Sequence, residues 1–166
     1  MVDEGYAADL QNLYRAKNES DIYAVLDFCE KYDGKLGLGQ IPDLMKMFNE
    51  NTEASPAQNE YIVELLDKIV EKYGQEAVNI IVERSDSLLE EDSEGCMPYL
   101  IIMFFFWHAD RQFDIVTPLR TAKDHIKKLY QKWVHEKIDY MQKHSEYYKP
   151  EQVKRIQHIE EQLSEL

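Results

Sequence analysis

The strongest constraint on this chain is an uncharged run of eleven residues, MPYLIIMFFFW, from Met97 to Trp107. A helix needs roughly 17 to 25 apolar residues to cross a bilayer, whereas runs of about 10 to 14 more often belong to a buried core. Glu94 precedes the run and His108 follows it. A helix that is apolar on every side must be covered on every side. We therefore expect a helix over residues 96–109 at the centre of a helical bundle or helical-repeat stack.

Most of the remaining chain separates into polar and apolar faces at helical spacing, and no segment alternates as a strand does. The clearest helix follows Ser55, where Pro56 and Gln58 fit the first turn, and it would end before Gly74. The sequence predicts a single all-α domain over residues 1–166, with about eight helices in antiparallel pairs, as a HEAT-like repeat or a compact bundle. The other expected helices cover residues 4–16, a segment that begins after an N-cap at Ser20, a short segment around Pro42, and residues 75–89, 117–144 and 150–165.

The chain has a formal net charge of −13, and the excess of acid lies in its first two thirds. Residues 1–110 carry 8 basic and 23 acidic side chains, whereas residues 111–166 carry 11 and 9. An acidic surface disfavours nucleic acid and anionic membranes and attracts basic partners, although it also serves solubility alone. The start of the chain has an acid pair and no apolar leader, which predicts a cytoplasmic location.

The sequence contains no motif typical of catalysis or of metal or cofactor binding. None of the five histidines follows a glutamate by three residues. His135 and Asp139 form a His/carboxylate pair at helical spacing, which we expect on a charged surface. Cys29 and Cys96 lack a C-x-x-C spacing and are interpreted as buried apolar thiols. We therefore expect no enzyme activity, no metal and no cofactor.

Two segments have the outline of an EF-hand, which gives the alternative interpretation of the chain. In FCEKYDGKLGLGQIPDLM, Gly34 lies at loop position 6 and Leu36 at position 8, and a second outline surrounds Gly95. At the ligand positions the first loop offers Cys29, Lys31, Asp33 and Gln40, and the second offers Glu90, Asp92, Glu94 and Ile101. Neither set ends in the bidentate glutamate that calcium needs. The alternative is thus a degenerate, calcium-independent light-chain or adaptor protein that binds a helical target.

The order of elements between Ile41 and about Trp133 carries a family resemblance. A short helix with an acidic tail (IPDLMKMFNENTE) precedes a paired-helix unit (EYIVELLDKIVEKYGQEAVNIIVERSDSLL), the apolar helix and a further charged helix. In this order the chain resembles the HEAT-like helical-repeat immunity proteins encoded beside bacterial polymorphic toxins of contact-dependent and Rhs-type systems. The resemblance implies a non-catalytic cytosolic inhibitor of one cognate toxin. It supplies no binding residues.

Candidate partner-binding residues therefore come from charge and periodicity. Acidic side chains recur on the outer side of two expected helices and form two rows. The first acidic row is Glu60, Glu64, Asp67 and Glu71, and the second acidic row is Glu76, Glu83 and Glu90. Each row could also be an ordinary solvated face. We expect these rows to bind a basic protein, such as a nuclease toxin, because complementary charge speeds association. The long helix expected over residues 117–144 would also suit a homodimer.

Overall fold

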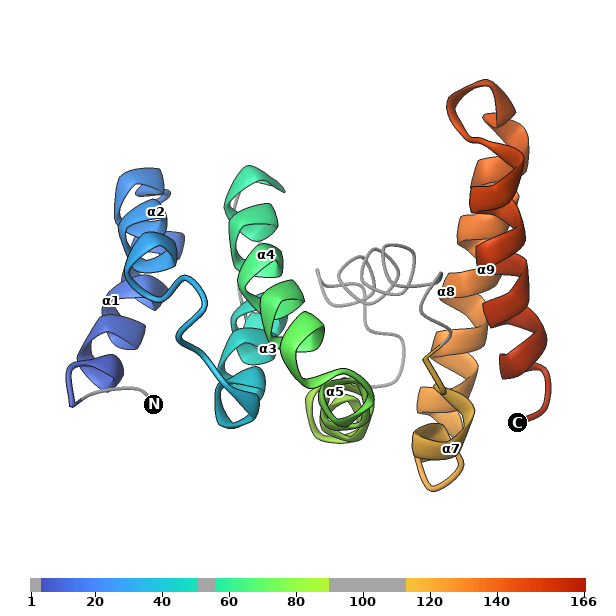
Figure 1. The fold of residues 1–166 in the computed structure, drawn as a ribbon, viewed down its shortest axis with the longest axis horizontal. Coiled ribbons are helices and arrows are strands. Elements are labelled where there is room, and N and C mark those ends of the chain that lie inside the picture. Colours follow the sequence, from blue (N-terminus) through green and yellow to red (C-terminus); the bar gives the residue numbers. More distant parts are fainter. Residues whose placement is uncertain (1–3, 51–55, 90–112) are drawn as a thin grey trace. The chain divides into compact units, whose positions relative to one another are not determined.

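The computed structural model describes residues 4–50, 56–89 and 113–166, and within these ranges the chain is all-α, as predicted (Figure 1). Eight α-helices and two short 3₁₀ helices make up this part of the chain, and it contains no strand. The α-helices are α1 (Tyr6–Asn18), α2 (Ile22–Lys31), α3 (Ile41–Glu50), α4 (Pro56–Tyr73), α5 (Gln75–Leu88), α7 (Val116–Leu119), α8 (Asp124–Lys143) and α9 (Pro150–Leu163). The 3₁₀ helices are η1 (Leu38–Gln40) and η3 (Ser145–Tyr147).

Packing contacts divide the chain into two compact units, residues 1–81 and 82–166, with the boundary inside α5. Each unit has buried side chains of its own, for example Leu44 and Leu66 in the first and Leu119 and Ile126 in the second, all 0% exposed. The expectation of one domain stays a prediction.

In the first unit, helices pack as two stacked hairpins. Helices α1 and α2 are antiparallel, because Tyr6 near the start of α1 packs its ring near Tyr32 after α2, with ring centroids 5.4 Å apart. Helices α1 and α3 run in the same direction, since Tyr6 Oη donates to Asp43 Oδ2 at 2.9 Å and the later Lys17 Nζ donates to the Met47 carbonyl at 3.2 Å. Each hairpin therefore repeats the direction of the one before it.

Helices α2 and α4 complete this stack and also run in the same direction. The Cys29 thiol donates to the Tyr61 carbonyl oxygen at 3.7 Å, and further along the chain Asp33, just after α2, pairs with Lys68 of α4. The first helices of the two hairpins, α1 and α3, thus lie side by side, and so do the second helices, α2 and α4. This is the arrangement of helical-repeat proteins, in which each hairpin buries its apolar face against the next.

In the second unit, α8 and α9 form an antiparallel hairpin (Figure 1). Gln131 Nε2 donates to the Leu163 carbonyl at 3.0 Å, and His135 Nδ1, one turn later in α8, meets Glu160 Oε2, one turn earlier in α9, at 3.1 Å. The end of α5 joins this unit through the buried hydroxyls of Ser85 and Tyr130, which lie 2.6 Å apart.

Local signals place several helix ends as predicted. Pro56 is the first residue of α4, where its missing N–H is not needed. Gly74 follows the last residue of α4 with φ +62°, the left-handed conformation that commonly closes a helix. Pro150 opens α9 in the same way. The expected helix over residues 96–109, its role as the core and the second EF-hand outline lie outside the described residues.

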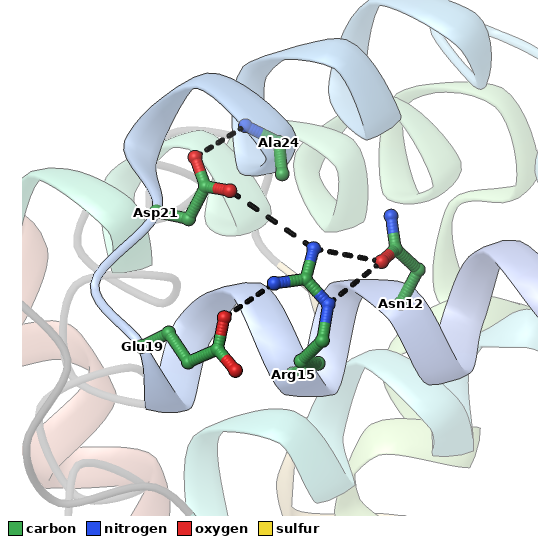
Figure 2. A network of polar contacts seen from close by, with 5 residues as sticks. All are labelled: Asn12, Arg15, Glu19, Asp21 and Ala24. Atoms are coloured by element: carbon green, nitrogen blue, oxygen red, sulfur yellow. Dashed lines mark hydrogen bonds and ion pairs between the residues drawn. The ribbon is translucent and has the colours of Figure 1, made fainter.

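The N-cap of α2 is Asp21, not Ser20 as predicted. Asp21 Oδ1 accepts the Ala24 N–H at 3.2 Å. Figure 2 shows this contact together with the Arg15 side chain, which bridges Asn12, Glu19 and Asp21. Ser20 takes φ 57° instead, and this reversal lets the Asp21 N–H reach the Ala16 carbonyl at 2.8 Å. Both residues are good N-caps, so the geometry of the turn decides between them.

The helix expected over residues 117–144 is divided. Helix α7 ends at Leu119, the chain turns through residues 120–123, and α8 begins at Asp124. Lys123 is extended (φ −62°, ψ 150°), and its N–H donates to Asp86 Oδ1 at 3.1 Å. A hydrogen bond to a residue distant in the sequence replaces the helical one, so apolar spacing through this segment did not reveal the break.

Candidate functional site

Helix α4 exposes most of the first acidic row. Glu60, Glu64 and Glu71 are exposed and Asp67 is half-buried, whereas Ile62 and Leu66 on the other side are 0% exposed. Charges three and four residues apart lie on one side of an α-helix, so the periodicity that buries the apolar side also orders the acids. The structure thus brings the four members of this row together on one side of α4.

The second acidic row is placed only in part. Glu76 and Glu83 are exposed on α5, seven residues apart and so on one side of that helix. Glu90 lies outside the described residues. The opposite side of α5 is buried, at Val78, Ile81 and the polar Ser85.

A groove between α2 and α4 was missed by the sequence reasoning. This α2–α4 groove has a volume of about 400 Å³ and is lined by Leu26, Cys29, Glu30, Asp33, Tyr61, Glu64, Leu65 and Lys68. Glu64 of the first acidic row therefore shares a depression with Glu30 and Asp33 of the preceding hairpin. No signal within either helix predicts this meeting, because it depends on how the hairpins stack.

The thiol of Cys29 lies half-buried in the α2–α4 groove. Burial and, secondly, the charge of Glu64 raise its pKa to about 11. The thiol is therefore protonated at neutral pH, which is the opposite of an activated nucleophile, whose pKa is lowered by nearby positive charge. Cys29 was predicted to be buried as an apolar residue, and the structure places it at the edge of the core. Cys96 lies outside the described residues.

The histidine and carboxylate singled out by spacing have other partners. His135 meets Glu160, while Asp139 Oδ2 accepts from Lys143 Nζ at 2.9 Å, and this hydrogen bond holds the pKa of Asp139 below its usual value. Across residues 4–50, 56–89 and 113–166, no group of three or more His, Cys, Asp or Glu side chains could hold a metal ion.

The first EF-hand outline folds as an ordinary connection between helices. Its first and third positions, Cys29 and Lys31, belong to α2. The side chain of Gln40, at the last ligand position, accepts the Gly37 N–H at 2.8 Å, so its oxygen caps η1. Leu36 is 5% exposed and belongs to the core. The EF-hand-like adaptor stays a prediction that no specific contact favours.

No family model, curated protein or solved structure matches the chain. Among the described helices none combines the length and the apolar character that a membrane crossing requires. The candidate site is therefore described by its geometry alone, as a row of exposed acids on α4 beside the α2–α4 groove.

Proposed function

We propose that the chain is a non-catalytic inhibitor that binds a basic protein, and that it acts in the cytoplasm as an immunity protein against a cognate bacterial toxin such as a nuclease. One observation carries the proposal: Glu60, Glu64 and Glu71 are exposed along one side of α4, while the opposite side of that helix is buried, for example at Ile62 and Leu66. Acids placed in this way can meet a basic surface without rearrangement of the backbone.

The physical advantage of such a surface is speed and selectivity. Complementary charge raises association rates above the roughly 10⁵–10⁶ M⁻¹s⁻¹ of neutral partners, and it excludes acidic competitors. A toxin that holds phosphate presents the matching cations. An inhibitor that covers these cations needs no catalytic group.

The direct test begins with recovery of the partner. The tagged chain is used in a pull-down from its native host at low and at moderate salt, with mass spectrometry of the bound fraction. We expect a single basic protein in stoichiometric amount, and co-expression of the chain should suppress the toxicity of that protein. Recovery of a long helical target instead would favour the adaptor, and absence of any bound protein at either salt would contradict the proposal.

The role of the first acidic row is tested with that partner. The triple variant Glu64→Lys/Asp67→Lys/Glu71→Lys should slow association at low salt by about tenfold or more and leave the far-ultraviolet circular dichroism unchanged. The matched control reverses three exposed acids elsewhere, Glu136, Glu161 and Glu165, with the same change in net charge. Equal slowing by both variants would reduce the effect to net charge and remove the first acidic row from the proposal.

A further inference from the structure

The α2–α4 groove combines apolar and acidic surface in one place. Leu26 and Tyr61 are half-buried in it, and Leu65, which is 4% exposed, also lines it. Tyr23 lies one turn before Leu26 on α2 and is 78% exposed. Partly exposed aromatic and aliphatic side chains around a depression are the usual anchors of a protein interface.

The charges of the α2–α4 groove are unbalanced. Three carboxylates line it, those of Glu30, Asp33 and Glu64, against one lysine, Lys68, which already pairs with Asp33. Glu60 lies one turn before Glu64 and is exposed. A groove in the second unit has a different balance of charge. The groove between α8 and α9 carries Lys132 and His135 beside Glu160, so its charges select no sign of ligand.

These features narrow the chemistry of an occupant. A wholly apolar segment would bury Glu30 and Glu64 without partners, and burial of an unpaired carboxylate is costly. A wholly polar cation would leave the apolar surface of Leu26, Tyr61 and Tyr23 in water. A segment that carries Lys or Arg beside apolar side chains satisfies both, because lysine and arginine stems pack on apolar surface while their charged ends reach carboxylates.

We propose that the α2–α4 groove binds an amphipathic, Lys- or Arg-bearing segment of the partner protein. The inference rests on the proposed function and names the contact surface within it. The partner's apolar residues lie on Leu26, Tyr61 and Tyr23, and its cations meet Glu30 and Glu64. The groove thereby extends the first acidic row onto α2.

The test uses the full chain with Cys96→Ser, so that Cys29 is the one thiol that reports. The probe is a helical peptide of leucine and lysine, about 18 residues or five turns long. Two comparison peptides have the same length, one with glutamate in place of lysine and one with serine in place of leucine. Binding is followed by fluorescence anisotropy, and occupancy of the groove by the rate of Cys29 alkylation with and without peptide.

The leucine–lysine peptide should bind at low salt and slow Cys29 alkylation by about fivefold or more when saturating, and both comparison peptides should bind at least about tenfold more weakly. Glu30→Lys/Glu64→Lys should abolish the protection of Cys29, whereas Glu136→Lys/Glu161→Lys, with the same change in charge, should keep it. Tyr23→Ala should weaken binding, and Tyr147→Ala, which removes a tyrosine that is 76% exposed, should not.

Several results would overturn the inference. These are binding without protection of Cys29, equal loss in both charge-reversal pairs, or tight binding of the glutamate peptide. Concentration-dependent self-association that Tyr23→Ala abolishes would make a second copy of the chain the occupant. The proposed function is judged separately: a Glu30→Lys/Glu64→Lys chain that still neutralises the toxin would remove the groove alone, and a wild-type chain that binds peptide but neutralises no toxin would remove the immunity role alone.

Discussion

At the scale of single residues, the turn between α4 and α5 depends on one backbone angle. Gly74 has φ +62°, and a Cβ placed there would meet no atom within 4 Å. Any penalty for a side chain at this position is therefore a backbone penalty rather than a clash. For non-glycine residues the left-handed conformation costs about 1–2 kcal/mol, part of which alanine recovers by restricting the unfolded chain.

We expect Gly74→Ala to lower the free energy of unfolding by about 1 kcal/mol, measured by urea denaturation. Gly39→Ala is the matched control, because Gly39 also has nothing within 4 Å of its would-be Cβ but lacks a positive φ. The control should be neutral or slightly stabilising. Equal destabilisation by both substitutions would show that the left-handed angle at Gly74 is not what stabilises the turn.

At the scale of elements, α5 and α8 are joined by a polar contact inside an apolar setting. Ser85 and Tyr130 are both 0% exposed, and their hydroxyl oxygens lie 2.6 Å apart. Burial, opposed in part by the Ser85 hydrogen bond, raises the pKa of Tyr130, so the phenol stays neutral throughout the ordinary pH range. In a low-dielectric interior such a pair is stabilising only while both partners are present.

A double-mutant cycle measures this contact. Tyr130→Phe and Ser85→Ala should each lower the free energy of unfolding by about 1–2 kcal/mol, because each leaves the opposite buried hydroxyl without this hydrogen bond. The double variant should lose less than the sum of the two, by about 1 kcal/mol. Strict additivity in thermal or urea unfolding would contradict an energetic coupling between α5 and α8 at this point.

For the helices, part of the observed fold could be predicted from the sequence and part could not. The ends of α4 follow from Pro56 and Gly74, whose signals are local, and the exposed side of α4 follows from periodicity. The burial of Val63 and Val70 does not follow from this periodicity, because it arises from the helices that pack on both flanks of α4. The break before Asp124 depends on a hydrogen bond to the distant Asp86.

The candidate site also has a part that could be predicted from the sequence and a part that could not. The exposure of Glu60, Glu64 and Glu71 follows from the pattern of one helix. The meeting of Glu64 with Glu30 in the α2–α4 groove follows from the parallel packing of two hairpins. Sequence periodicity fixes which side of a helix is polar, and it carries no information about which neighbouring helix that side meets.

At the scale of the whole molecule, the net charge of −13 opposes folding through self-repulsion. Added salt screens this repulsion, since the Debye length falls from about 30 Å at 0.01 M to about 8 Å at 0.15 M. We expect the thermal unfolding midpoint to rise by about 4 °C over this range of NaCl, which corresponds to relief of about 1–2 kcal/mol in a chain of this size. A midpoint that falls with salt would mean that ion pairs such as Lys31–Asp9 outweigh the repulsion.

The acids of the α2–α4 groove and the adjacent Glu60 should bear much of this repulsion, because residues 1–110 hold 23 acidic and only 8 basic side chains. Glu30→Gln/Glu60→Gln/Glu64→Gln should therefore raise the unfolding midpoint at low salt and flatten its salt dependence. Glu136→Gln/Glu161→Gln/Glu165→Gln should do so less, since basic side chains outnumber acidic ones in residues 111–166. If the groove binds as we infer, the first variant should also lose affinity for the leucine–lysine peptide. More stability together with less binding would indicate that these carboxylates are kept for a partner, whereas unchanged stability would indicate that the repulsion lies elsewhere.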